Sequence, residues 1–160
     1  MRPATAIPFL FQGQQIKAWG GPYQGTVTED GLQWIPYQPS SFPTPPFPEY
    51  VSGHSAFSAA GAEVLRRFTR SDYFGASVTF LAGSSTIEPG ATPAKGVTLF
   101  WETFTDAANE AGMSRRYGGI HFEPGDLVGR NTGRLVAIKA WKKAKSYING
   151  IEDRREQDHE

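Results

Sequence analysis

The chain has 160 residues, a length that forms one domain with a buried core, and its 16 Lys and Arg balance its 16 Asp and Glu. This zero net charge argues against a nucleic-acid partner, because proteins bind the phosphate backbone mainly through an excess of Lys and Arg. The absence of cysteine excludes disulfides, zinc–thiolate sites and cysteine nucleophiles. No apolar run approaches the ~20 residues that cross a bilayer, so we expect a soluble protein, cytoplasmic or secreted, and we identify no signal peptide.

The first third of the chain is predicted to be irregular. From Gly13 to Tyr50 the sequence is dense in Gly, Pro, Ser and aromatic residues. Proline at this frequency excludes a helix and is rare in central strands. The interleaved Trp, Tyr and Phe favour an ordered loop that packs onto the domain, because disordered segments are poor in aromatic residues.

Two helices are predicted in the middle of the chain. The first extends from Ser52 to Arg70, and its apolar face is formed by Phe57, Ala60, Val64 and Phe68. The second extends from Thr98 to Met113, with its apolar face formed by Phe100, Phe104, Ala107 and Ala111. Between them the helical pattern fails: residues 78–81 fit a short strand, and residues 84–96 are rich in Pro and Gly.

A third helix is predicted from Pro124 to about Ile148, because apolar residues recur at helical spacing and Pro suits a first helical turn. Its inward residues are expected to be Val128, Leu135, Ile138, Trp141 and Ile148. Residues 1–150 are therefore assigned to one helical domain. Residues 151–160 are assigned to a charged tail that frays.

Two short segments carry residues suited to anion chemistry. Ser52, Gly53 and His54 stand where the proline-rich segment ends and a helix begins, and helix N-termini bind anions through free N–H groups. Arg115 and His121 stand between the second and third predicted helices, where an Arg fork can hold a tetrahedral oxyanion. Taken singly, each segment is more simply interpreted as a helix cap with surface side chains.

The order of these segments is more specific than either alone. Arg2-Pro3, then Ser52-Gly53-His54, then Ser114-Arg115 followed after five residues by His121, resembles the three-part signature of the vanadium-dependent haloperoxidase and type-2 phosphatidic acid phosphatase superfamily. The surrounding segments 47–54 and 118–122 resemble haloperoxidases in particular. The resemblance implies a mainly α helical bundle, of which this chain is the C-terminal, active-site portion and thus a partial domain.

The resemblance also implies a role for each residue of the signature. Arg2, Arg115, Ser52 and the Gly53 amide would hold vanadate, or phosphate in the same site. His121 would bond to vanadium, or to phosphorus as a nucleophile, and His54 would be the acid–base residue. Phe47 occupies the position of a Phe in chloroperoxidase-like members, which indicates a halide pocket. The implied partners are hydrogen peroxide, a halide and a small organic substrate.

The sequence departs from the family pattern at positions that keep alternatives open. A Lys expected seven residues before Arg2 is absent, and so are the helices that precede it in the family, so we expect a truncated chain. Its uncovered helix faces then predict exposed hydrophobic surface or self-association into a homo-oligomer. An inactive fragment that lacks the Lys is therefore one alternative.

The second alternative is an acid phosphatase that forms a phosphohistidine intermediate at His121. The phosphatase branch typically has an Asp four residues after this histidine, and that position is Gly125 here. Asp126 is one residue further on, which rotates its side chain by about 100° around a helix. The sequence therefore favours the haloperoxidase.

Overall fold

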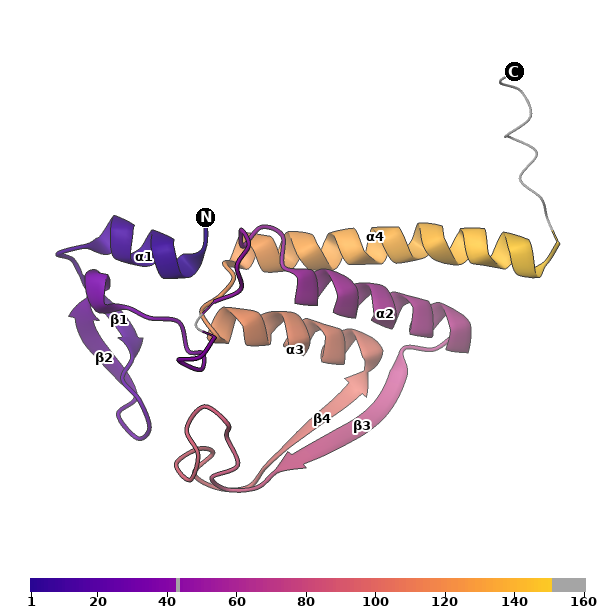
Figure 1. Ribbon diagram of the computed structural model, residues 1–160. Coiled ribbons are helices and arrows are strands. Elements are labelled where there is room, and N and C mark those ends of the chain that lie inside the picture. Colours follow the sequence, from indigo (N-terminus) through magenta and orange to yellow (C-terminus); the bar gives the residue numbers. More distant parts are fainter. Residues whose placement is uncertain (43, 151–160) are drawn as a thin grey trace, which may run out of the picture.

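The computed structural model describes residues 1–42 and 44–150, so the predicted charged tail lies outside the described residues. Helices α2 (Gly53–Thr69), α3 (Phe104–Tyr117) and α4 (Glu123–Ile148) pack side by side (Figure 1). Because α3 runs opposite to the other two, the start of α2, the end of α3 and the start of α4 share one end of the bundle. The predicted helical bundle is confirmed.

The bounds of α2 and α4 agree with the sequence prediction to within one residue. Ser52 caps α2, since its Oγ accepts a hydrogen bond from the Ser55 N–H at 3.2 Å. Pro124 lies in the first turn of α4, where its fixed φ suits a helix and its missing N–H costs nothing. Local sequence signals therefore define both helices.

Small residues form the seam between α2 and α4. Four of the five buried residues of α4 recur every fourth position, at Gly125, Gly129, Gly133 and Ala137, and the fifth is Asp126. A Cβ at Gly133 would overlap the Ala56 carbonyl oxygen. The two backbones thus approach too closely for larger side chains, and glycine is what permits the contact.

The prediction that large apolar residues of α2 and α4 face inward is wrong for most of them. Phe57 and Phe68 are 82% and 74% exposed, and Ile148 is 80% exposed. Val128 and Leu135 are also exposed, while Ile138 and Trp141 are half-buried. Because small residues form the seam, most bulky side chains lie outside it. Phe68 and Trp141 are an exception in that their rings, one from each helix, pack edge to face with centroids 6.3 Å apart. The prediction of exposed hydrophobic surface is confirmed.

The segment between α2 and α3 is a hairpin of β3 (Tyr73–Phe80) and β4 (Val97–Thr103), paired antiparallel. The predicted short strand is thus longer, and the helix predicted from Thr98 is wrong over its first six residues. Residues 97–103 are rich in β-branched and aromatic side chains, which favour a strand. Thr103 then caps α3, accepting a hydrogen bond from the Asp106 N–H at 2.9 Å.

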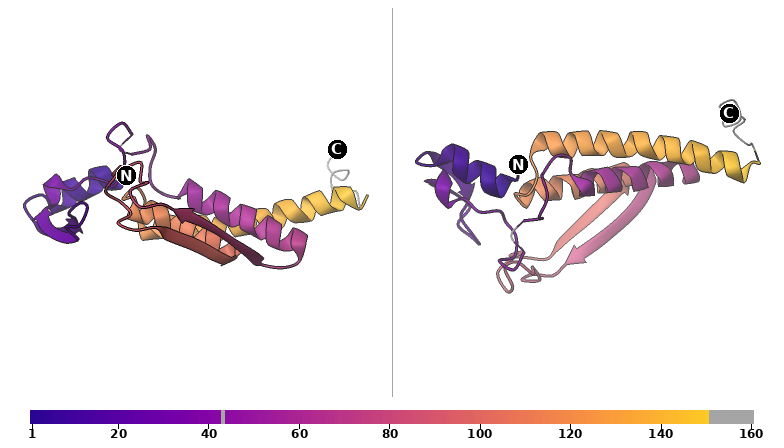
Figure 2. Two further views of the ribbon diagram at one scale, coloured as in Figure 1. Left: turned by 90° about the horizontal axis from the view of Figure 1, so that it is seen from below. Right: turned by 45° about the horizontal axis from the view of Figure 1, so that its top comes forward.

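The N-terminal part has more regular structure than predicted. It contains α1 (Pro3–Phe11), an antiparallel hairpin of β1 (Gln15–Trp19) and β2 (Thr26–Asp30), and the 3-10 helix η1 (Gly31–Gln33). This unit projects from the end of the bundle where α4 begins (Figure 2). Of the residues predicted to be irregular, those from 34 to 50 that the structure describes are irregular. In residues 1–42 and 44–150, no helix has both the length and the apolar character that crossing a membrane requires.

Candidate oxyanion site

His121 is buried at the end of the bundle where α4 begins, with only 5% of its surface exposed. Its Nδ1 lies 2.6 Å from the main-chain carbonyl oxygen of Glu49. A carbonyl oxygen can only accept a hydrogen bond, so Nδ1 carries the proton and donates it. The other ring nitrogen, Nε2, is therefore free of a proton in the neutral ring, which is the form that bonds to an electrophile.

A glycine at the end of α3 brings His121 to this position. Gly119 has φ +68°, a conformation that ends helices and favours glycine. The Ile120 N–H donates to the Arg115 carbonyl oxygen across the turn at 3.2 Å. The chain thus reverses within a few residues, buries Ile120 and places His121 close to the last turn of α3.

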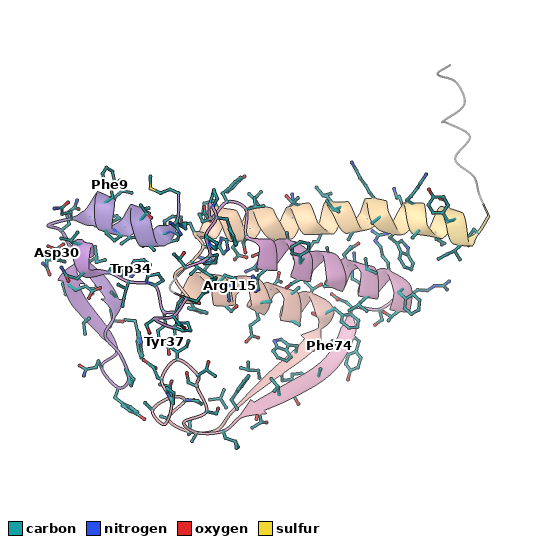
Figure 3. The ribbon with its side chains drawn as sticks, viewed as in Figure 1. Phe9, Asp30, Trp34, Tyr37, Phe74 and Arg115 are labelled. Atoms are coloured by element: carbon teal, nitrogen blue, oxygen red, sulfur yellow. The ribbon has the colours of Figure 1, made fainter. Side chains whose placement is uncertain are left out.

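Arg115 lies in that last turn of α3, not in a loop as the sequence suggested. Its Nε is buried and has no hydrogen-bond partner among the described residues. Burial lowers the pKa of its guanidinium group from the usual value. Figure 3 shows Arg115 where the end of α3 meets the starts of α2 and α4. A buried donor without a partner is costly, so this nitrogen is suited to a ligand that accepts hydrogen bonds.

His54 is the second residue of α2 and therefore lies at the same end of the bundle. Its pKa is lowered by partial burial first, and then by electrostatic interactions with Arg115 and His121. These two electrostatic effects require that His54, Arg115 and His121 lie close together. The structure therefore brings three of the predicted site residues into one cluster.

Ser52 and Gly53 stand at the start of α2. The helix itself offers no partner to its first N–H groups, those of Gly53 and His54. The Ser52 side chain is fully buried, and its Oγ accepts the Ser55 N–H and lies 2.8 Å from the Ser55 Oγ. Its predicted role as an oxyanion donor stays a prediction, because the hydrogen bonds it makes here are internal.

Arg2 and Phe47 lie together beside the segment that precedes Glu49. The Arg2 guanidinium donates to the Pro45 carbonyl oxygen at 3.3 Å. Arg2 and Phe47 both line a cavity of about 330 Å³. Glu49 connects this N-terminal segment to His121. Its N–H donates to the Met1 carbonyl oxygen at 3.4 Å, and its own carbonyl oxygen accepts the hydrogen bond from His121 Nδ1.

Two buried carboxylates were not assigned a role from the sequence. Glu49 is 8% exposed, and its Oε2 lies 3.5 Å from His121 Nδ1. Asp126 is fully buried and accepts hydrogen bonds from Ser55 Oγ at 2.7 Å and from both Arg130 Nε and Nη2. One sequence signal points to Glu49, since it is the only Asp, Glu, Lys or Arg between Asp30 and Glu63.

The donor set suits an oxyanion. It comprises a buried arginine, free helix N–H groups and two histidines, all of which donate hydrogen bonds or carry positive charge. Within the described residues, no group of three or more His, Cys, Asp or Glu that would hold a metal cation lies together. The chain is thus a helical-bundle protein with a candidate anion site where the start of α2, the end of α3 and the start of α4 meet.

Comparisons with known proteins agree with this class. Residues 1–150 match the family model described as the second helical-bundle domain of VCPO. The chain therefore belongs to the vanadium chloroperoxidase family, which confirms the family resemblance inferred from the signature residues. A comparison with curated protein sequences finds no match.

Solved structures of the family resemble the chain closely. Holo and apo structures of a bacterial vanadium-dependent chloroperoxidase each superpose with a TM-score of 0.81 at 32% identity, over 93% of this chain. A bacterial vanadium-dependent iodoperoxidase gives a TM-score of 0.50 at 34% identity, over 71% of this chain. The chain spans 31% of the length of the chloroperoxidase and 24% of that of the iodoperoxidase.

Proposed function

We propose that the chain provides the vanadate-binding part of a haloperoxidase that oxidises a halide with hydrogen peroxide. The observation that carries the proposal is the buried Arg115 Nε, which has no hydrogen-bond partner in the part of the chain that the structure describes and lies in a cluster with His54 and His121. The family match and the vanadium dependence of both similar peroxidases support vanadate as the anion.

Each residue of the cluster then has a defined task. When vanadate is bound, Arg115 and the Gly53 amide would donate hydrogen bonds to its oxygens, and Arg2 and Ser52 would contribute further donors. His121 would bond through Nε2, whose lone pair is available because Nδ1–H is held by the Glu49 carbonyl oxygen. His54 would accept or donate a proton beside the bound group, and Phe47 would line the halide pocket.

The overall reaction balances without a further oxidant. One halide ion, one hydrogen peroxide and one proton give hypohalous acid and water: the halide loses two electrons, and the O–O bond of the peroxide breaks as it takes them up. Vanadate, when bound, supplies Lewis-acid activation of the peroxide without a change in oxidation state. His54 has a lowered pKa and is therefore neutral at pH 7, ready to accept the proton of an incoming peroxide.

A bromination assay tests the proposal. Purified chain would be incubated with orthovanadate, bromide, hydrogen peroxide and phenol red, and formation of the brominated dye measured. We expect turnover that requires both vanadate and peroxide, and a loss of at least about 100-fold in Arg115→Ala and His121→Ala. Dye bromination that persists in His121→Ala would contradict the assigned role.

A second candidate, an acid phosphatase that forms a phosphohistidine, is favoured by one observation. The sequence argued against it because Gly125 supplies no carboxylate to His121, yet the Glu49 carboxylate lies 3.5 Å from Nδ1. The same preparation is assayed with a phosphomonoester in the absence of vanadate. Turnover that disappears in His121→Ala would support the phosphatase, while a chain inactive in both assays would support the fragment alternative.

A further inference from the structure

Glu49 fills the space beside His121 that a side chain at position 125 would otherwise occupy. A Cβ built on Gly125 would overlap Glu49 Oε2, and it would also meet the Glu49 carbonyl oxygen at 3.3 Å. Position 125 is the one where the phosphatase branch of the superfamily typically carries an Asp. The carboxylate has therefore not been lost from this chain, because Glu49 provides it from the loop before α2.

We propose that Glu49 is the positioning residue of His121 and replaces the carboxylate missing at Gly125. This inference rests on the proposed function only in that His121 is taken as the residue that bonds to the oxyanion. Glu49 acts through His121 at two points. Its carbonyl oxygen accepts Nδ1–H at 2.6 Å, and its carboxylate lies 3.5 Å from the same nitrogen.

The carboxylate is also attached to the start of α4. Its Oε2 accepts the Phe122 N–H at 3.2 Å, at the N-terminal end of the helix, where a negative charge is favoured. Phe122 directly follows His121, so one carboxylate oxygen holds the backbone beside the ring as well as facing the ring. The orientation of the imidazole and the position of the Glu49 carbonyl are thereby coupled.

Burial makes the charge effective. Glu49 is 8% exposed and His121 is 5% exposed, so solvent screens the attraction between them only weakly. The imidazole ring becomes more positive when Nε2 bonds to an electrophilic centre. A carboxylate beside Nδ1–H stabilises this form, as in the carboxylate–histidine pairs that support metal-ligating histidines.

A purely structural role for Glu49 makes a different prediction. If its side chain only capped α4, a glutamine would serve equally well, because its amide oxygen also accepts the Phe122 N–H. Glu49→Gln keeps the volume and the acceptor and removes the charge. Glu123→Gln is a matched control, because it removes a carboxylate from the same helix end, but one that is 60% exposed and paired with Arg116.

Two measurements are needed on the wild type and both variants. The first is the nitrogen and proton resonance of His121 Nδ1–H in the ¹⁵N-labelled chain without any oxyanion. The second is the dissociation constant for orthovanadate, with inorganic phosphate as competitor. We expect Glu49→Gln to shift the resonance and to weaken orthovanadate binding by about 10-fold or more. Glu123→Gln should change neither the resonance nor, by more than about 2-fold, the affinity.

Moving the carboxylate from position 49 to position 125 gives a second test. Gly125→Asp alone should weaken binding, because its side chain overlaps Glu49. Glu49→Ala alone should weaken it as well, because the carboxylate is lost. In the double variant Glu49→Ala/Gly125→Asp the new carboxylate has room, so orthovanadate should bind more tightly than in either single variant.

Two results would overturn the assignment: an unchanged resonance and affinity in Glu49→Gln, or a folded double variant no better than Glu49→Ala. If the alanine variants do not fold, as thermal unfolding would reveal, Glu49→Gln decides alone. If the chain binds no oxyanion, the His121 Nδ1–H resonance in Glu49→Gln, compared with that of the wild type, tests the assignment by itself. If the wild-type chain binds orthovanadate but does not oxidise bromide, the proposed haloperoxidase function is wrong. The role of Glu49 in positioning His121 would not be affected by that result.

Discussion

The seam between α2 and α4 and the outer faces of the same helices differ in the size of their side chains. At the seam, the α4 residues are Gly125, Gly129, Gly133 and Ala137, whereas the outer faces carry Phe57, Leu135 and other large apolar residues in solvent. The buried hydrophobic residues of the described chain are four alanines and Ile120. Close backbone approach therefore dominates the contact between these two helices, and one aromatic pair, Phe68 with Trp141, adds an edge-to-face contact beside it.

Gly133→Ala should have the largest effect on stability. The new Cβ would overlap the Ala56 carbonyl oxygen, so α2 and α4 must separate. We expect the free energy of unfolding to fall by about 3 kcal/mol, the upper end of the cost of overpacking. Chemical denaturation of the two chains measures the difference. A loss under about 0.5 kcal/mol would mean that the seam is loosely packed.

Glu63→Gln tests the ion pairs that the buried Glu63 side chain of α2 makes with two arginines of the same helix. Glu63 is 5% exposed and accepts hydrogen bonds from Arg66 at 2.7 Å and Arg67 at 2.6 Å. Burial alone would raise its pKa, but these arginines outweigh burial and the pKa is lowered. We expect the variant to lose about 1.5 kcal/mol at pH 7, the low end for charged hydrogen bonds because both arginines are partly exposed.

The same variant should show a defined pH dependence. Since folding lowers the pKa of Glu63, its contribution is fully present above the unfolded value near 4.5 and is lost as the pH falls through the folded value. The difference in unfolding free energy between wild type and Glu63→Gln should therefore shrink below pH 4.5. A difference that stays constant down to pH 3 would contradict the assigned ion pairs.

Gly61→Ala makes the same chemical change as Gly133→Ala, but away from the seam. A Cβ at Gly61 meets no atom within 4 Å, and the residue lies inside α2. We expect a gain of about 0.5 to 1 kcal/mol, because alanine loses less backbone entropy than glycine in a helix. Opposite signs for the two alanine variants, measured by the same denaturation, would confirm the contrast.

Phe57→Ser should have the smallest effect on the stability of the chain. Its side chain is 82% exposed, so we expect a change within about 0.5 kcal/mol. Self-association through the outer faces, measured by sedimentation, should weaken if these faces cause it. A large loss of stability would instead place Phe57 in a packed interface of the monomer.

The sequence predicted those parts of the fold that local signals define. Ser52 and Pro124 mark helix starts, and the structure places α2 and α4 within one residue of the prediction. The β4 strand was missed because Phe100 and Phe104 have helical spacing although a strand ends between them. The seam was missed because helical periodicity identifies apolar faces and gives no weight to glycine.

The candidate site shows the same division. His54, Arg115 and His121 could be predicted because their order along the chain resembles a known signature. The sequence singles out Glu49 only as an isolated charge, and its role could not be predicted because it depends on a contact with a residue 72 positions away. The absence of a side chain at Gly125 was interpreted as a missing carboxylate, whereas the structure shows that the space is filled from another element.

The hydrogen bond from the Glu49 N–H to the Met1 carbonyl oxygen has a practical consequence for handling the protein. An affinity tag or fluorophore attached ahead of Met1 could disturb this hydrogen bond. Glu49 in turn accepts a hydrogen bond from His121 Nδ1, so the disturbance would reach the imidazole ring. The far end of α4 is a safer place for attachment. Its 26 residues extend about 39 Å at 1.5 Å per residue, so a label beyond Ile148 is remote from the site.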